Sequence, residues 1–226
     1  MASARRAPTA LVTLLALGLL ALAACGGSSE HHHDDGAAIV GASSSSGGTT
    51  TGYGGIVPVP ALDVGALSLP NVADGGASLA LRAQPGHVLL VFLGFTHCTD
   101  VCPTTMAELR AAVKRLPAAD RDRVDVAFIT VDPERDTPAV VRDYVTSFFP
   151  DGAALRTDDD AQLRTVARAL WAAYEVTKQA DGTVAVDHTT FVIAIGPDGH
   201  VLVEWPYGTK AGAYADGLAQ LLADVG

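Results

Sequence analysis

The chain has 226 residues, of which 49% are hydrophobic and 18% are charged, and its formal net charge is −10. A chain of this size and composition can bury one good hydrophobic core. The acidic charge argues against nucleic acid as a partner, because the phosphate backbone is itself negative. The same charge suits a soluble domain that works beside a membrane.

The N-terminal segment is typical of an export signal. Arg5 and Arg6 precede an apolar run over residues 11–22 that is too short to span a bilayer comfortably, and small residues then lead to Cys25. This pattern resembles a bacterial lipoprotein signal, in which residues 1–24 are removed and Cys25 becomes the lipid-bearing N-terminus. An uncleaved anchor and a plain secretory signal are the alternatives. The lipoprotein interpretation predicts a cell-envelope protein attached to the outer face of the cytoplasmic membrane.

The next segment, residues 25–56, is rich in Gly, Ser, Thr and Ala and lacks the apolar periodicity of a folded core. Its composition predicts a flexible tether. Within it, the run His31-His32-His33, followed by two aspartates, could collect a metal ion through imidazole and carboxylate groups, or could be a solvated polar run. No transmembrane helix is expected after the tether begins, and residues 57–226 are predicted to form the globular domain.

Strand and helix patterns alternate along the predicted domain. Continuous apolar runs predict buried strands, and apolar residues at helical spacing behind capping residues predict helices. A Gly-Pro-Asp-Gly turn signal predicts an antiparallel pair of strands near the end of the chain. In chain order, we expect a strand at 88–92, a helix at 104–116, a strand at 124–131, helices at 137–148 and 158–174, strands at 190–195 and 201–205, and a helix at 211–223. This order predicts an α/β fold of the thioredoxin-like type, with a central mixed sheet flanked by helices on both faces.

Two cysteines, Cys98 and Cys102, lie where the first of these strands gives way to a helix. If both lie on one helical turn, their Cα atoms are roughly 6 Å apart, so the pair can form or open a disulfide. A loop of about five residues would stabilise the fold by only about 2 kcal/mol, which makes a purely structural disulfide the weaker interpretation. The start of a helix favours the thiolate, which binds metals and attacks disulfides. We therefore expect a redox-active thiol pair.

A third candidate ligand, His188, lies far along the chain in the sequence Val-Asp-His-Thr-Thr. It falls just before the strand expected at 190–195, at the edge of the predicted sheet, where a loop can reach the start of the helix. A single histidine beside a strand is more often a surface residue or a satisfied core residue. The case for His188 as a ligand therefore depends on the sequence motifs around it.

Three motifs occur in order along the domain. They are Phe-Thr-His-Cys-Thr-Asp-Val-Cys-Pro-Thr at 95–104, Thr-Val-Asp-Pro-Glu-Arg-Asp-Thr-Pro at 130–138 and Val-Asp-His-Thr at 186–189. Together they resemble the Sco/SenC family, the copper-binding assembly factors of cytochrome c oxidase, over residues 57–226. The resemblance implies a thioredoxin-like fold and implies that Cys98, Cys102 and His188 bind copper.

The ligands that the resemblance implies, two thiolates and one imidazole, suit copper. Thiolates are soft donors for Cu(I), and an imidazole lets the same site tolerate Cu(II), whereas zinc would accept these ligands but generally takes a fourth. Binding displaces thiol protons, so copper affinity should fall with acid and nearly vanish in the disulfide form. Asp132, at the end of the second predicted strand, could orient His188 or add a weak outer ligand, or could only end the strand.

The expected function is a metallochaperone rather than an enzyme. It would deliver copper to a copper-accepting protein, with a cytochrome c oxidase subunit as the expected partner. Transfer would proceed by ligand exchange, as acceptor thiolates or imidazoles replace the three ligands one at a time. A flexible tether suits this task, because the domain must meet its acceptor at the membrane surface.

One departure from the family pattern supports rival interpretations. The residue after the first cysteine is Thr99, where the family usually has proline, and Thr99 to Cys102 resembles the peroxidatic Thr-x-x-Cys motif of peroxiredoxins. A thiol peroxidase would use Cys102 as nucleophile and Cys98 as resolving thiol. The proline that precedes that motif in peroxiredoxins is absent here. A thiol-disulfide reductase that keeps another protein's copper site reduced is the third interpretation, although its usual signature is Cys-x-x-Cys.

Overall fold

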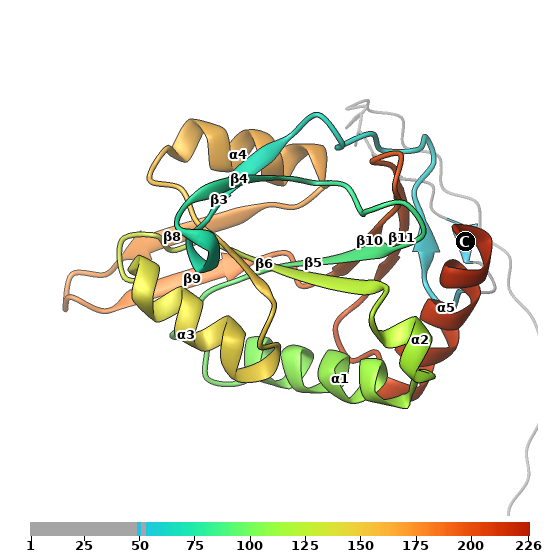
Figure 1. Ribbon diagram of the computed structural model, residues 1–226. Helices are drawn as coiled ribbons and strands as arrows, with labels where there is room; N and C mark the ends of the chain where they lie inside the picture. Colours follow the sequence, from blue (N-terminus) through green and yellow to red (C-terminus); the bar gives the residue numbers. More distant parts are fainter. Residues whose placement is uncertain (1–48, 51–52) are drawn as a thin grey trace, which may run out of the picture. The chain divides into compact units, whose positions relative to one another are not determined.

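A computed structural model of the chain describes residues 49–50 and 53–226 (Figure 1). The predicted signal segment 1–24, the lipidation site Cys25 and the histidine run of the tether lie outside the described residues, so these features stay predictions. In the part of the chain that is described, no helix is both long and apolar enough to cross a membrane.

The described residues form a nine-stranded mixed sheet built around two parallel strands, β5 (Val88–Gly94) and β6 (Val124–Thr130). Every residue of β5 is buried, as the continuous apolar run predicts for a strand covered on both faces. On one side of this pair the sheet continues through β10 (Val192–Ile195), β11 (Val201–Trp205), β2 (Ile56–Val57) and β1 (Thr49–Thr50), and on the other through β7 (Ala153–Leu155), β3 (Ser68–Asn71) and β4 (Ala77–Ala80).

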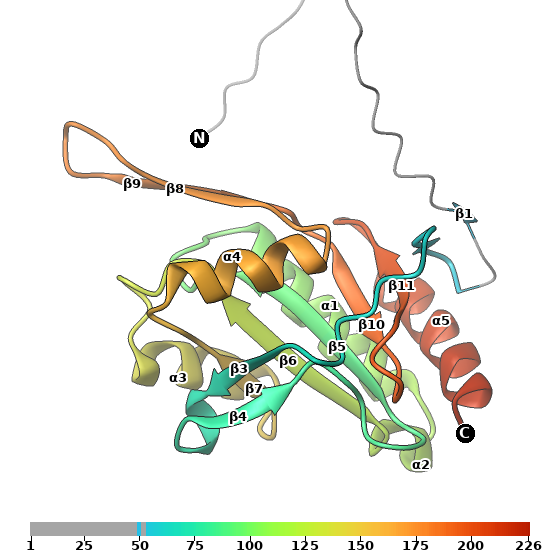
Figure 2. The ribbon, with the colours of Figure 1, turned by 90° about the horizontal axis from the view of Figure 1, so that it is seen from above.

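The two faces of the sheet carry separate hydrophobic cores. Because side chains alternate along a strand, the even-numbered residues from 88 to 92 enter one core and the odd-numbered residues from 89 to 93 enter the other. Residues of α1 (Val101–Arg115), α3 (Pro138–Phe148) and α5 (Ala211–Asp224) belong to the first core, and residues of α4 (Asp160–Ala169) belong to the second (Figures 1 and 2). The predicted thioredoxin-like α/β fold, with helices on both faces of a mixed sheet, is confirmed.

Local sequence signals explain most element boundaries. Helix α3 starts at the predicted place, where the Thr137 side chain accepts a hydrogen bond from the Val140 amide. Helix α1 starts at Val101, three residues earlier than predicted, and ends with Lys114 and Arg115 in its last turn, where cations complement the helix dipole. The remaining short elements are the helix α2 (Ala118–Arg121) and a 3-10 turn, η1 (Val72–Asp74).

Helix α4 is shorter than the sequence predicts, because it ends at Ala169. The Ala172 amide donates to the Ala167 carbonyl at 2.8 Å, and Trp171 adopts a left-handed conformation with φ 49°, which together close the helix end. The chain then forms an unpredicted antiparallel hairpin of β8 (Tyr174–Lys178) and β9 (Val184–His188). Figure 2 shows this hairpin extending away from the main sheet.

The folded part of the chain includes residues just ahead of position 57. Ile56 of β2 pairs with Glu204 of β11, and the Trp205 indole donates its Nε1 proton to the Tyr53 carbonyl at 2.9 Å. The Tyr53 carbonyl also lies so close to α5 that a β-carbon on Gly217 would be 2.3 Å from it. Residues 53–56 therefore pack on the domain that was expected to begin at residue 57.

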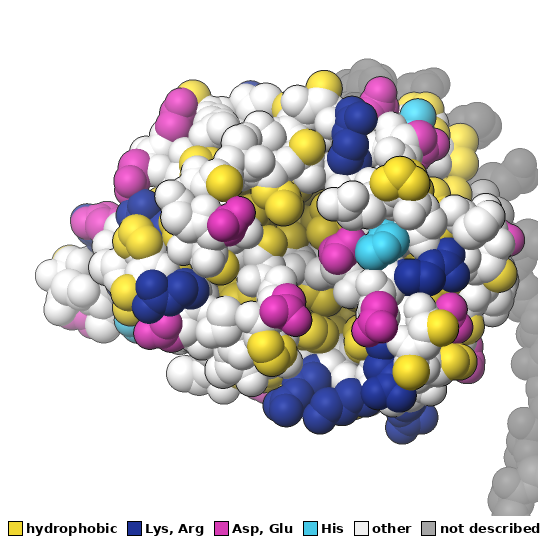
Figure 3. All heavy atoms as spheres, viewed as in Figure 1, with side chains coloured by type: hydrophobic (Ala, Val, Ile, Leu, Met, Phe, Trp, Pro, Cys, Tyr) yellow, Lys and Arg dark blue, Asp and Glu magenta, His cyan; other side chains and the backbone are white. Residues whose placement is uncertain are grey.

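Basic side chains gather along one edge of the face seen in Figure 3, over α1 and α2. Exposed Arg110, Lys114, Arg115 and Arg121 belong to these two helices. On the same face, acidic side chains are scattered and do not form a comparable group. This basic edge lies on α1 toward its C-terminal end, away from the cysteine pair at the start of the helix.

Glu204 on β11 is a buried carboxyl without a full set of partners. It is 5% exposed, and its Oε1 atom has no hydrogen-bond partner among the described residues. Burial raises the pKa of Glu204 to about 7. Since the folded-state pKa lies above the unfolded value, the contribution of this group to stability is complete below the unfolded pKa and is lost as the pH rises through about 7.

We therefore expect Glu204→Gln to stabilise the protein at pH 8 by about 1–3 kcal/mol, the usual cost of leaving a buried polar group unsatisfied. At pH 5 the same substitution should change stability little, because the native carboxyl is already neutral there. Thermal unfolding at both pH values measures the difference. Glu175→Gln, at an exposed position on β8, is the control. An equal effect of Glu204→Gln at pH 5 and pH 8 would contradict the assignment.

Candidate metal-binding site

Cys98 lies in the turn between β5 and α1, three residues before the helix begins, so the two cysteines do not share one helical turn as expected. Its sulfur still reaches the helix start, where it accepts a hydrogen bond from the Cys102 amide at 3.2 Å. Asp100, the N-cap residue, makes no side-chain capping bond. Cys98 Sγ therefore takes the place of a capping oxygen at the positive end of the helix. Both cysteines are free thiols.

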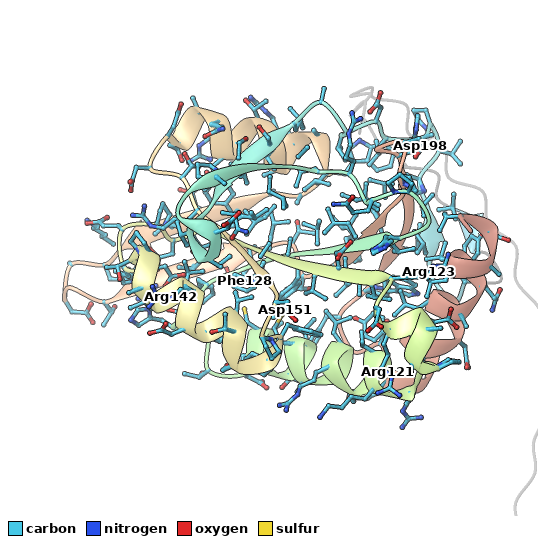
Figure 4. All side chains as sticks on the ribbon, viewed as in Figure 1. Arg121, Arg123, Phe128, Arg142, Asp151 and Asp198 are labelled. Atoms are coloured by element: carbon cyan, nitrogen blue, oxygen red, sulfur yellow. The ribbon has the colours of Figure 1, made fainter. Side chains whose placement is uncertain are left out.

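Cys102, in the first turn of α1, is fully buried. A β-carbon on Gly94, at the end of β5, would lie 2.9 Å from Cys102 Sγ and 2.8 Å from Phe128 Cε2, so glycine at this position makes room for the sulfur. Figure 4 shows Phe128 on the face of the sheet that α1 and α3 cover. Burial raises the pKa of the Cys102 thiol far above its ordinary range. A metal or a base must remove this proton before the sulfur can bind a metal.

His188 is the last residue of β9, at the base of the hairpin, and not in a loop before the next strand as expected. Its Nε2 atom lies 3.6 Å from Cys102 Sγ, and its Nδ1 atom lies 3.0 Å from the Thr189 carbonyl oxygen. Since a carbonyl only accepts, Nδ1 carries the proton and Nε2 presents its lone pair to the sulfur. The rings of Phe92 and Phe95 hold the imidazole edge-on at 6.2 and 5.8 Å. Burial lowers the pKa of His188, which keeps the ring neutral.

Asp132 is 2% exposed, but its carboxylate is bound to Arg135 Nε and not to His188. The guanidinium of Arg135 lies over the Phe95 ring at 5.9 Å, and its Nη2 atom is buried without a hydrogen-bond partner among the described residues. The structure thus gives the orientation of His188 to the Thr189 carbonyl, whereas the sequence suggested Asp132 for that role. Asp132 acts on the site through Arg135 and the Phe95 ring.

A second buried carboxyl, Asp136, holds the loop that leads into Cys98. It is fully buried and accepts hydrogen bonds from the Thr96 amide at 3.0 Å, the Thr96 hydroxyl at 2.5 Å and the Thr130 hydroxyl at 2.6 Å. His97 Nδ1 lies 3.4 Å from the same carboxyl. Sequence reasoning did not identify this function of Asp136. The two motifs that Asp136 ties together, at 95–104 and 130–138, were the available signal.

The structure brings Cys102 and His188 into contact and places Cys98 beside Cys102. Within the described ranges, however, no three histidine, cysteine or acidic side chains are already gathered so that they could hold a metal ion. The Cys98 sulfur is turned toward the Cys102 amide, so joining the other two groups requires its side chain to rotate. The arrangement is a thiol pair at a helix start with a neutral imidazole facing the buried sulfur.

The two thiols should differ strongly in reactivity. Cys98 is partly exposed, whereas Cys102 is fully buried and its thiol proton is held by a raised pKa. With limiting iodoacetamide at pH 8, we expect alkylation at Cys98 to be at least about tenfold faster than at Cys102, because one pKa unit changes the thiolate fraction about tenfold. Peptide mass spectrometry of quenched samples measures both rates. Faster alkylation of Cys102 would contradict the burial and proton assignment.

The sheet, the thiol pair at the start of the first long helix and the histidine from the hairpin define a thioredoxin-like thiol protein. The chain belongs to the SCO1/SenC family, whose sequence model matches residues 72–223. It is 32% identical to a protein of Stutzerimonas stutzeri named "Putative copper-binding protein", over 62% of this chain and 66% of that protein. It is 35% identical to the human mitochondrial protein named "Protein SCO1 homolog", over 59% of this chain and 45% of that protein. The chain thus spans about half to two thirds of the length of these relatives.

Solved structures of the family share the fold. The copper-bound ScoI structure from Bradyrhizobium japonicum superposes with a TM-score of 0.59 at 30% identity, over 68% of this chain and 96% of that one. The solution structure of apo Sco1 from Thermus thermophilus gives a TM-score of 0.61 at 30% identity, over 79% of this chain and 98% of that one. Both likenesses cover nearly the whole of the solved chain.

Proposed function

We propose that the protein is a membrane-anchored copper metallochaperone that carries copper on Cys98, Cys102 and His188 and delivers it to a cytochrome c oxidase subunit. The 3.6 Å separation of Cys102 Sγ from His188 Nε2 carries this proposal. The copper named for the Stutzerimonas stutzeri relative and seen in the Bradyrhizobium japonicum structure supports the choice of metal. Two thiolates and an imidazole are suitable donors for Cu(I) and for Cu(II).

The geometry of the sulfur and the imidazole fits a shared metal ion. Two ligands at about 2.3 Å for sulfur and about 2.0 Å for nitrogen from a tetrahedral metal are roughly 3.6 Å apart, taking zinc-site bond lengths as a guide. The proton on Nδ1 leaves the lone pair of Nε2 facing that position. Copper replaces the proton of Cys102, and the Cys98 side chain turns from the amide of Cys102 to complete the set.

The thiol pair also gives the site a switch. Joining Cys98 to Cys102 in a disulfide removes both sulfur donors, so the oxidised protein binds copper weakly or not at all. In the reduced protein, the more exposed Cys98 is the ligand that an acceptor thiolate or imidazole replaces first. Buried Cys102 and His188 hold the ion until the acceptor has supplied its own ligands.

The organisation of the chain supports work at a membrane. We propose that residues 1–24 are a lipoprotein signal, that Cys25 carries lipid on the outer face of the cytoplasmic membrane, and that residues 25–56 tether a domain over 57–226. A tether of roughly 30 residues has a root-mean-square span of about 30 Å, which lets the domain reach an acceptor in the same membrane.

A reductase role that keeps the oxidase copper site reduced is the second candidate, and the unequal exposure of the two sulfurs favours it. Cys98 would attack an acceptor disulfide, and Cys102 would then release the acceptor dithiol as the Cys98–Cys102 disulfide forms. The peroxidase alternative fits less well. Its nucleophile, Cys102, is fully buried and has a raised pKa, whereas a peroxidatic thiol must be exposed and ionised.

Anaerobic competition titration with a Cu(I) chelator tests the proposal. The reduced full chain should bind one tightly held copper, and the Cys98–Cys102 disulfide form should bind at least about 100-fold more weakly. Incubating the loaded chain with a copper-free soluble domain of a cytochrome c oxidase subunit should move the copper. Equal affinity in the reduced and disulfide forms would refute the ligand set. Reduction of an acceptor disulfide by the copper-free chain would support the reductase role.

A further inference from the structure

Trp171 combines exposure with an unfavourable backbone conformation. It is 38% exposed, and it is the only non-glycine residue with a positive φ among the described residues. It directly follows the closing turn of α4, a position where glycine is usual because other residues pay roughly 1–2 kcal/mol for the left-handed conformation. The other tryptophan, Trp205, is fully buried. A large aromatic residue held at the surface in a strained conformation is a candidate for contact with another molecule.

The hydrogen bonds at the base of the hairpin place Trp171 close to His188. Tyr174 pairs with His188 across β8 and β9. One step further, the Thr189 amide donates to the Ala173 carbonyl at 2.9 Å, and the Ala173 amide donates to the Thr189 hydroxyl at 3.0 Å. Trp171 is two residues from Ala173, so their Cα atoms are at most about 7 Å apart. A molecule that approaches His188 at the hairpin base is therefore within reach of Trp171.

An open hollow next to Trp171 in the chain is lined by two arginines. Arg164, Arg168, three alanines at 167, 172 and 173, and Tyr174 surround a space of about 180 Å³. A second open hollow, of about 470 Å³, lies over the hairpin base and includes His188 in its lining. Ala173 and Tyr174 line both hollows, so the two are neighbours on the surface.

The charges around the first hollow are not balanced by the protein itself. Arg164 is bound to Asp160 at 2.7 Å and lies over the Tyr174 ring at 5.0 Å. Arg168 is exposed and takes part in none of the ion pairs among the described residues, which include that of Arg164. An exposed arginine without an acidic partner is unusual in a chain of net charge −10. A carboxylate from another molecule can occupy this place, because a guanidinium binds a carboxylate through two hydrogen bonds.

We propose that Trp171, Arg168 and the hollow between α4 and β8 form a docking surface for the copper acceptor. The acceptor presents an acidic surface, places a carboxylate against Arg168 and packs apolar area on Trp171. Docking in this way holds the acceptor's ligands beside His188. The inference rests on the proposed function for the identity of the partner.

Binding of the reduced, copper-free full chain to the copper-free soluble domain of a cytochrome c oxidase subunit tests the proposal. Isothermal titration calorimetry at low salt gives the affinity. Trp171→Gly should raise the thermal midpoint, because glycine relieves the left-handed strain, yet weaken the complex at least about tenfold. Arg168→Glu should also weaken it at least about tenfold and reduce its salt dependence. Arg110→Glu, the same charge change at an exposed position on α1, should stay within about twofold of the wild-type affinity.

Two results would overturn the docking surface. One is a complex as tight for Trp171→Gly and Arg168→Glu as for Arg110→Glu, and the other is the lack of any complex with the wild-type chain. Each variant should keep the wild-type copper affinity, which separates docking from metal binding. Failure of the proposed function has a different sign, since the wild-type chain itself would then not bind copper, while the copper-free binding experiment would still decide on the surface.

Discussion

Replacing Cys102 by serine is expected to lower the Cu(I) affinity of the reduced protein at least about 100-fold, since loss of an outer-sphere partner of a metal ligand alone costs 10–100-fold. Serine fits the buried space beside Gly94 but supplies a hard oxygen in place of a soft thiolate. Cys98→Ser should have a loss of similar size. His188→Ala should weaken Cu(II) more than Cu(I), because imidazole is the harder donor of the set. Anaerobic competition with a Cu(I) chelator and an aerobic Cu(II) titration measure the two affinities.

The matched control for the histidine is His87→Ala. His87 precedes β5, at the opposite end of the strand from Gly94, and its Nδ1 lies 3.1 Å from the Asp125 carboxylate. This variant removes a partly buried imidazole without touching the proposed ligands, so copper affinity should not change. Circular dichroism of each variant checks that the fold is retained. Ligand variants that bind copper as tightly as the wild type, or a loss in His87→Ala equal to that in His188→Ala, would disprove the assignment.

The fold could be predicted from sequence where burial imposes a strong pattern. The run from Val88 is buried on both faces, and α3 has both a Thr137 cap and an apolar stripe, so their local signals and their final places agree. The turn between β10 and β11 was equally clear. By contrast, β8 and β9 alternate between exposed and partly buried residues and include several polar side chains. Their hairpin lacks a continuous apolar face, and the periodicity of α4 masked the point where that helix ends.

The candidate site shows the same division. Cys98, Cys102 and His188 could be singled out because their side chains have few structural uses at such positions, and because the family motifs contain them. What could not be predicted was the packing between distant segments. The glycine that admits the Cys102 sulfur, the Thr189 carbonyl that fixes the imidazole and the carboxyl of Asp136 act only after the strands are assembled. No spacing rule along the chain encodes these contacts.

Asp136→Asn is expected to destabilise the protein by about 2–4 kcal/mol, because hydrogen bonds to a charged group are worth about 1.5–3 kcal/mol and a buried donor left unpaired costs more. The native carboxyl accepts from the Thr96 amide, the Thr96 hydroxyl and the Thr130 hydroxyl. An asparagine of the same shape turns an amide NH₂ toward some of these donors, so at least one of them loses its partner. Urea unfolding, monitored by the fluorescence of Trp205 and Trp171, measures the change.

The same substitution links the stability of the fold to the site. Asp136 ties the Thr96–His97 segment to the end of β6, and Cys98 follows directly, so releasing this segment should let the first sulfur move. We expect the copper affinity of Asp136→Asn to fall about tenfold at temperatures where it is fully folded, as for loss of an outer-sphere partner. Asp143→Asn, on an exposed carboxylate of α3, should change neither quantity. Full destabilisation with unchanged copper affinity would limit Asp136 to a structural role, because the loop would then hold Cys98 without it.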